Sequence, residues 1–246
     1  MDASCELLLL QICDSVFPIG AYSHSFGLET YIQRGLVRDA ATAGAYVAQQ
    51  IRYPLCYTEL LGMRLAFEAA GARDWDRIAR LEADMAAAKV PVEVRVASQR
   101  MATRFCKTAA TLLEGEPARV FGMYVTSSGL TPAGGEGSAP ARPSAAPAHM
   151  VNAAYGVFAC VAGIDEEELL RRYLYSQVSA MVTNCVKTVP LSQTVGQELL
   201  RAAVPLQLAA VARALEADES LLGLSMPGFD VRCIEHETLY SRLYMS

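Results

Sequence analysis

Apolar residues recur along most of the chain at intervals of three and four, the spacing that keeps them on one face of an α-helix. The pattern is broadest between Asp165 and Lys187, where the stripe comprises Leu169, Leu170, Tyr173, Leu174, Val178, Met181, Val182, Cys185 and Val186. Asp165 is a suitable N-cap, and three glutamates follow it where negative charge complements the helix dipole. Lys187 falls at the other end, just before Pro190 stops the helix. The pattern predicts a long helix that ends in a cation next to a turn.

Two further helical segments precede this one. The first runs from Asp39 to Ala70 and contains Pro54, which has no N–H and whose ring clashes with the preceding turn. Two helices or one bent helix both fit this segment. Residues Asp74 to Ala88 have the same periodicity and predict another helix.

The segment from Val90 to Leu113 contains "VPVEVRV", which alternates with the period of a strand. Its length favours a helix, because strands usually run for only about 4 to 8 residues. Ser192 to Leu215 completes the set, with Pro205 as a second internal interruption. The sequence therefore predicts an all-α protein, a bundle of roughly eight to ten helices.

One segment breaks the helical pattern. Gly129 to Ala148, "GLTPAGGEGSAPARPSAAPA", is made almost entirely of Gly, Pro, Ala and Ser and has little to bury, so it predicts a mobile loop. The helices on either side are too few to form two cores, so we expect one domain over residues 1–246. Its C-terminal tail is expected at residues 235–246.

The composition narrows the classes of partner. Hydrophobic residues make up 52% of the chain, above the roughly 45 to 50% typical of soluble domains, and the surplus suggests a subunit interface. The net charge of -5 and the lack of a basic run argue against nucleic acid or anionic lipid as a partner. Apolar runs are too short for a signal peptide or a membrane span. A cytoplasmic protein is expected.

Residues able to carry chemistry are sparse. The chain has three histidines, His24, His149 and His236, which are far apart and form no metal-binding pair. Its seven cysteines are scattered and include no C-x-x-C pair. No phosphate-binding loop is present. No catalytic residue, metal site or tightly bound cofactor is predicted.

Residues 17–31, "FPIGAYSHSFGLETY", form the most distinctive short stretch. Pro18 fixes φ and Gly20 allows a positive φ, which predicts a rigid turn. Ser23 or Ser25 could cap the helix that continues through the rest of the stretch.

That turn would leave Tyr22 and His24 ordered and accessible, and aromatic groups held rigidly at a surface are good anchors for protein partners. Near the C-terminus, Arg242 lies in "YSRLYMS", where chains usually fray. A helical tail is nevertheless expected to present an apolar face that needs a partner, formed by Leu239, Tyr240, Leu243 and Tyr244.

Four segments, in this order, carry a resemblance to a known family: "DSVFPIGAYSHSFGLETYIQ", "HMVNAAYGVFACVAGI", "YLYSQVSAMVTNCVKTVPLSQTVGQELL" and "HETLYSRLYMS". Together they resemble the urease accessory protein F family, UreF, over essentially the whole chain except Gly129 to Ala148. The resemblance implies an all-helical, commonly dimeric protein without enzymatic activity. It would join UreD, also called UreH, to the GTPase UreG and regulate UreG while nickel is delivered to apo-urease, through a tunnel proposed for the assembled complex.

The resemblance also implies roles for single residues. Tyr22 and Arg242 look like the residues that engage UreG, and His24 and Glu29 share the first motif. Tyr240 lies in the terminal motif. Lys187 is similar to the lysine proposed to influence the GTPase, as trans-acting basic residues do; a plain partner for the helix dipole is the structural alternative.

Two other functions are weighed against this adaptor. A metallochaperone would bind nickel directly through the histidines or cysteines, although convergent donors are not apparent. A Cys/His hydrolase would need a selectively reactive thiolate, and no known signature surrounds any cysteine.

Overall fold

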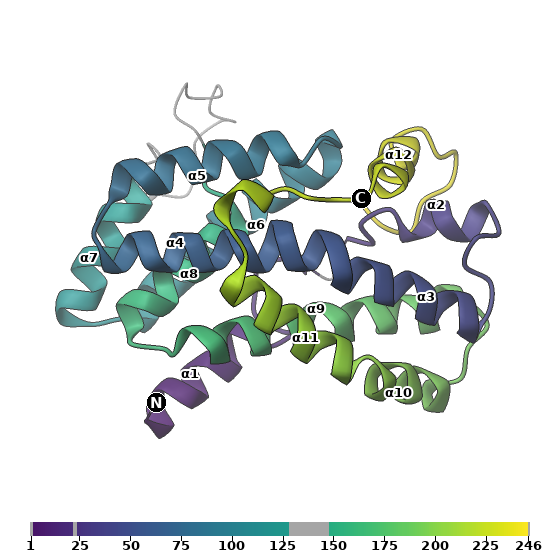
Figure 1. Cartoon of the computed structure of the whole chain (residues 1–246), viewed down its shortest axis with the longest axis horizontal. Coiled ribbons are helices and arrows are strands. Elements are labelled where there is room, and N and C mark those ends of the chain that lie inside the picture. The colour runs from purple at the N-terminus through teal and green to yellow at the C-terminus, as the bar shows by residue number, and fades with distance from the viewer. Residues whose placement is uncertain (1, 22–23, 128–147, 246) are drawn as a thin grey trace, which may run out of the picture.

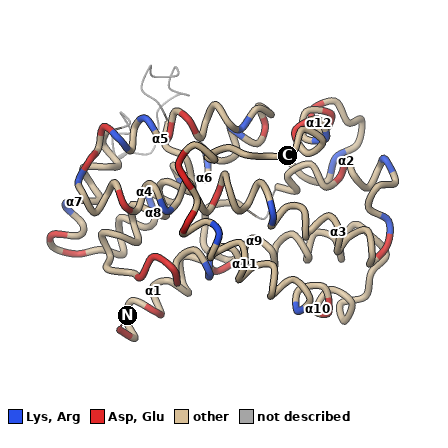
Figure 2. Tube along the Cα trace, in the orientation of Figure 1, with Lys and Arg blue, Asp and Glu red and all other residues tan. Residues whose placement is uncertain are grey.

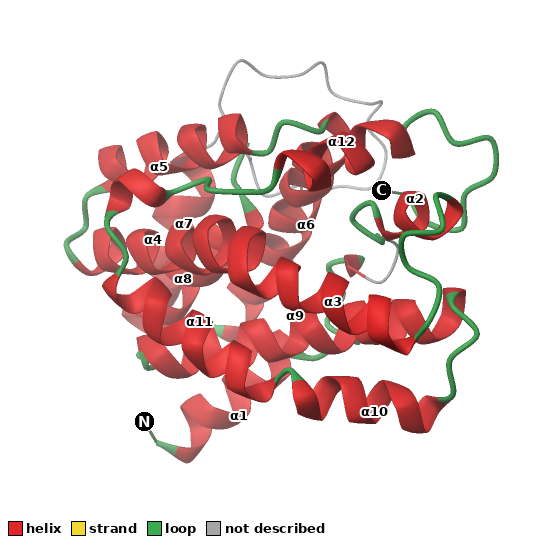
Figure 3. Cartoon of the chain, turned by 45° about the vertical axis from the view of Figure 1, so that its right-hand side comes forward, coloured by secondary structure: helices red, strands yellow, loops and turns green. Residues whose placement is uncertain are grey.

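The computed structural model describes residues 2–21, 24–127 and 148–245. These residues form helices and loops without a strand, which confirms the all-α prediction (Figures 1 and 3). Because α3 and α4 are joined through the π-helix η2, the twelve α-helices of this part of the chain make eleven separate rods, slightly more than expected. Their bounds are α1 Ala3–Cys13, α2 Leu28–Gln33, α3 Ala40–Gln50, η2 Ile51–Leu60, α4 Leu61–Gly71, α5 Trp75–Ala88, α6 Val92–Ala109, α7 Gly115–Ser127, α8 Val151–Ala162, α9 Glu166–Thr188, α10 Gln193–Ala202, α11 Val204–Glu216 and α12 Pro227–His236, with 3-10 turns at Ala110–Leu112 and Glu219–Leu221.

Side-chain caps explain where several helices begin. Asp39, Asp74, Asp165 and Ser192 each accept a hydrogen bond from the backbone N–H three residues further on, at 2.8 to 3.2 Å. The predicted N-cap at Asp165 is thereby confirmed. The four helices so started are α3, α5, α9 and α10.

Pro54 bends the helical register without breaking the rod. The helix continues from Ala40 to Gly71, with the π-helix η2 in its middle third. The N–H of Leu61 donates to the carbonyl of Cys56, five residues back, so the wider turn bridges a stretch where proline supplies no donor. The single-helix alternative is therefore the observed one. Pro205, by contrast, lies in the first turn of α11, after a break between α10 and α11.

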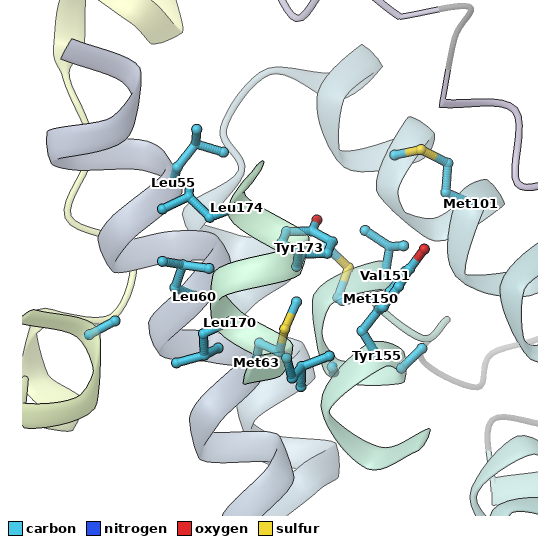
Figure 4. Close-up of a cluster of buried hydrophobic side chains, with 14 of the residues drawn as sticks. Leu55, Leu60, Met63, Met101, Met150, Val151, Tyr155, Leu170, Tyr173 and Leu174 are labelled. Carbon is cyan, nitrogen blue, oxygen red and sulfur yellow. The ribbon is translucent and has the colours of Figure 1, made fainter. Parts of the chain in front are cut away.

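The core is built around α4 and α8. At Gly156 an added Cβ would lie 2.3 Å from the carbonyl oxygen of Met63, so only glycine allows the two backbones to approach this closely. Helix α9 packs against the same centre, and Figure 4 shows Tyr173 and Leu174 of α9 beside Tyr155 of α8 and Leu60 of η2.

A smaller apolar cluster holds α12 against α6. It consists of Val94, Phe229 and Cys233, with Phe26 packed beside it. Gly27 has a φ of +80° and an added Cβ there would lie 2.7 Å from the Sγ of Cys233, so glycine is required on both counts. In Figures 1 and 3 the C-terminus lies beside α12 and α2. This cluster therefore places the end of the chain next to its first motif.

One expectation is wrong, and others fall on residues that the structure does not describe. Helix α2 begins after Gly27 without a side-chain hydrogen bond at its N-cap, so Ser25 does not cap it, and Ser23 lies outside the described residues. Of the Gly129–Ala148 segment, only Ala148 is described.

In the part of the chain that the structure covers, no helix is long and apolar enough to cross a membrane. Charges of both signs are scattered over a mostly uncharged trace (Figure 2).

Candidate functional site

The C-terminal tail is fastened to the first motif by Glu29. This residue lies in the first turn of α2, and 6% of its surface is exposed. Its Oε1 accepts a hydrogen bond from the N–H of Leu243 at 2.8 Å, and its Oε2 accepts one from the N–H of Tyr244 at 2.9 Å. Two successive backbone donors thus converge on one carboxylate, as charge-assisted hydrogen bonds that are stronger than neutral ones.

His236 bridges this carboxylate to a second one. Its Nε2 lies 3.1 Å from Glu29 Oε2 and its Nδ1 lies 2.8 Å from Glu93 Oε2, and the ring is fully buried. An ionised carboxylate only accepts hydrogen bonds, so each ring nitrogen of His236 faces an acceptor. The ring therefore joins α12 to α2 and α6.

Arg242 completes the arrangement. Its Nη1 lies 2.6 Å from Glu93 Oε1, with 37% of its side chain exposed. The guanidinium of Arg242 and the imidazole of His236 thus lie against the two carboxylates. We call Glu29, Glu93, His236 and Arg242 the tail clasp.

The clasp corrects the expectation of a helical or frayed tail. After α12 ends at His236, residues 237–245 form turns and bends. The N–H groups of Leu243 and Tyr244 donate to Glu29 instead of to carbonyls one helical turn back, so the helix does not continue.

A second tether joins the tail to α9. The hydroxyl of Tyr244 and Oδ1 of Asn184 are 3.1 Å apart, and Nδ2 of Asn184 donates to the carbonyl of His24 at 3.2 Å. Burial, with the nearby charge of Glu29, raises the pKa of Tyr244, so its phenol stays neutral at physiological pH. The tail, the first motif and the last turns of α9 therefore meet at Asn184.

His24 is not displayed as expected. Only 7% of its surface is exposed, and its ring stacks on Phe26 with centroids 5.7 Å apart. Burial lowers the pKa of His24, and Arg104 and Arg100 lower it further, so the ring is held neutral. Nearby, Arg104 donates a hydrogen bond to the carbonyl of Ile19, the residue before Gly20, at 3.2 Å. Tyr22 lies outside the described residues.

The remaining predicted residues lie at the surface. Lys187 is exposed in the last turn of α9, as the sequence predicted, and makes no ion pair with any residue that the structure describes. Tyr240 is fully exposed. Leu243 and Met245 are also largely exposed, at 81% and 55%. The clasp thus holds the tail backbone while several of its apolar side chains face outward.

A cavity of about 930 Å³ extends inward from this region. It runs beneath residues 14–21 and 24–26 and between η2, α6, α8 and α9, and its lining includes His24, Asn184 and Lys187. A buried ion pair between Lys89 and Glu59 also lines it. Lys187 of α9 and His24 of the first motif therefore line the same cavity.

The histidines and cysteines do not converge. His149 lies apart from the clasp, 2.9 Å from Glu82, and no group of His, Cys, Asp and Glu placed for a metal ion occurs among the described residues. Burial raises the pKa of Cys13, Cys106 and Cys185 to about 12. Such thiols are protonated at neutral pH and are poor nucleophiles.

Sequence reasoning singled out Glu29 and Arg242 as partner-binding residues, but it did not single out the two residues that connect them in the structure. Glu93 is the acidic position in "VPVEVRV", and His236 opens "HETLYSRLYMS". The residues are 143 positions apart, and they meet because α12 packs on α6. A buried histidine at a helix end is the one local signal that could have suggested a carboxylate partner.

Fold and site together define an all-helical protein whose polar groups fasten its own tail beside its first motif, leaving the tail's apolar side chains at the surface. The model of the UreF family matches residues 37–204, which is 168 of the 246 residues. The chain therefore belongs to the UreF family, whose members are accessory proteins of urease maturation. The match includes Lys187 and Glu93, whereas Glu29, His236 and Arg242 flank it.

Proposed function

We propose that this chain is a non-catalytic adaptor that joins UreD/UreH to the GTPase UreG and regulates GTP hydrolysis by UreG during nickel insertion into apo-urease. The observation that carries the proposal is the tail clasp, which orders Arg242 next to Glu93 while Tyr240 and Leu243 face outward. Ordered aromatic and arginine side chains are the residues that most often dominate protein interfaces. Family membership supports the same role.

Lys187 is proposed to act on UreG directly. It is an exposed cation at the end of a 23-residue helix, near the tether that Asn184 makes to the tail. A cation in this position is suited to a carboxylate or phosphate on a partner GTPase. Nickel is the cargo of the assembled complex in this proposal, and the chain is expected to act as a homodimer in the cytoplasm, without nucleic acid or membrane as a partner.

The first experiment measures assembly. Size-exclusion chromatography with light scattering would follow the chain alone, then with UreD, and then with UreD, UreG, GTP and nickel. We expect a dimer that forms one stable ternary species. Failure to bind either folded partner would contradict the adaptor role, and stoichiometric sub-micromolar nickel binding by the chain alone in equilibrium dialysis would favour the metallochaperone instead.

Arg242→Ala tests the tail. We expect UreG capture by the complex to weaken by about tenfold, the loss typical of a hot-spot side chain, with little change in the stability of the fold. Arg34→Ala is the matched control, because Arg34 is an exposed arginine paired at 3.0 Å with Glu235 beside the same helices. Unchanged capture by Arg242→Ala in a pull-down would remove Arg242 from the contact.

A further inference from the structure

We infer that His236 is a positioning residue that holds the C-terminal tail, and with it Tyr240 and Arg242, in the form that a protein partner binds. The inference deepens the proposed function and rests on it. His236 itself is fully buried and touches no partner, so it acts through the tail alone.

The ring of His236 is held firmly in place by the packing of α12. His236 is the last residue of α12, one turn after Cys233, which belongs to the apolar cluster with Phe229 and Val94. That cluster fixes α12 against α6, and Gly27 at the start of α2 meets Cys233 closely enough to exclude a side chain. The imidazole ring is therefore set between Glu29 and Glu93 by packing on three helices.

Each of the two carboxylates has a separate bond to the tail. Glu29 accepts from Leu243 and Tyr244, and Glu93 accepts from Arg242. Glu29 and Glu93 expose only 7% and 23% of their side chains. Without the ring between them, the two carboxylates would face each other with little water to screen their like charges. Relief would come from moving the carboxylates apart, and the tail is bonded to both.

A tail that is already ordered lowers the free-energy cost of partner binding. A partner that meets a disordered segment must order it, and that cost reduces affinity. The clasp fixes residues 242–244 in advance, so Tyr240, which is two residues away and fully exposed, is held near one position. Without His236, the tail would have to be ordered when the partner binds, and the affinity would fall.

The test compares two buried histidines by the same substitution. His236→Leu removes both ring nitrogens that contact Glu29 and Glu93, whereas His149→Leu removes a buried histidine that bonds Glu82 elsewhere in the fold. We expect amide exchange at Leu243 and Tyr244, followed by NMR, to accelerate by at least about tenfold in His236→Leu and to stay unchanged in His149→Leu. Capture of UreG by the complex with UreD is expected to weaken by about tenfold or more in His236→Leu alone.

Two results would overturn the inference. One is unchanged amide exchange at Leu243 and Tyr244 in His236→Leu. The other is faster exchange with unchanged UreG capture, while Arg242→Ala weakens capture. If the unaltered chain captures neither UreD nor UreG, the proposed function fails first and the inference fails with it, and the exchange data then show whether the clasp at least fastens the tail.

A second variant covers the case in which His236→Leu does not fold. Glu93→Ala removes the other half of the bridge from a partly exposed position of α6. It leaves Arg242 without its carboxylate and His236 with one acceptor. We expect the same faster exchange, and unchanged exchange and capture in this variant would overturn the inference equally.

Discussion

Two buried histidines in this chain are paired with glutamates, and the two sites differ in what surrounds them. Glu82 accepts from Tyr124 and from the backbone of Met150, and His149 bonds both Glu82 and the carbonyl of Tyr124. All of these groups belong to the interior. At the tail clasp the same pairing of imidazole and carboxylate continues to Arg242 and to the backbone of an exposed segment.

The two sites have different roles although both pair an imidazole with a carboxylate. The interior site joins α5, the end of α7 and the start of α8, so its bonds stabilise the fold. The clasp joins α2, α6 and α12 to a tail that adds little to the core, since Tyr240 and Leu243 are exposed. We therefore expect changes at the interior site to lower the stability of the whole fold, and changes at the clasp to act mainly on the tail.

Glu82→Ala should have the largest effect. It leaves the imidazole of His149, the hydroxyl of Tyr124 and the N–H of Met150 without their acceptor, all in a buried setting. Leaving one buried hydrogen-bonding group without its partner costs about 1 to 3 kcal/mol, so the loss of the acceptor of three such groups should cost about 3 kcal/mol or more. Urea denaturation followed by circular dichroism would measure the loss. A loss below about 1 kcal/mol would mean that the interior site is no more important to the fold than a surface ion pair.

A matched pair of Glu→Gln substitutions sharpens the comparison. In Glu82→Gln the remaining oxygen can still accept from Tyr124 and Met150, and the new amide can donate to His149 Nδ1, so we expect a loss of only about 0.5 to 1.5 kcal/mol. In Glu29→Gln the amide must face a backbone N–H, because each oxygen of Glu29 already accepts one. The tail should therefore be released, with faster removal of the last residues by carboxypeptidase.

The control for this pair is the stability of the fold itself. Glu29→Gln should retain most of its resistance to urea while it loses the tail, and Glu82→Gln should keep the tail protected. If carboxypeptidase removes the tail equally fast from both variants, the two sites are not separate, and the contrast between fold and tail is wrong.

What could be predicted from the sequence depends on how local its cause is. The helix from Asp165 to Lys187 follows from an N-cap and a periodic stripe within one segment, and the structure has it within a residue. The π-helix at Pro54 could not be chosen over a break, because the choice depends on packing along both sides of the proline. The residues that decide are far away in sequence.

The residues of the candidate site also differ in how far the sequence alone could predict them. The motifs drew attention to Glu29 and Arg242, but the sequence does not state that His236 lies between Glu29 and Glu93, because this needs α2, α6 and α12 to meet. His24 was expected at the surface, since "GAYSHSFG" reads as an exposed turn. Instead its ring is buried at the cavity lining, where it stacks on Phe26.

His24 extends the comparison to a histidine whose surroundings favour the neutral ring. Burial lowers the pKa of His24 most, followed by Arg104 and Arg100, while Glu93 acts in the opposite direction. Near and below the ordinary value of about 6.5, the unfolded chain binds a proton that the folded chain does not. The contribution of His24 to stability is therefore full at higher pH and declines as the pH falls through about 6.5.

The expected effect is smaller than that of either glutamate substitution, and it is read as a difference. Urea midpoints of the unaltered chain and of His24→Gln would be compared at pH 7.5 and 5.5. Because all other titratable groups are the same in both proteins, their contributions cancel in the difference, and the unaltered chain should lose more stability on acidification than the variant. An equal loss in both would mean that His24 is as free to take up a proton in the fold as in the unfolded chain.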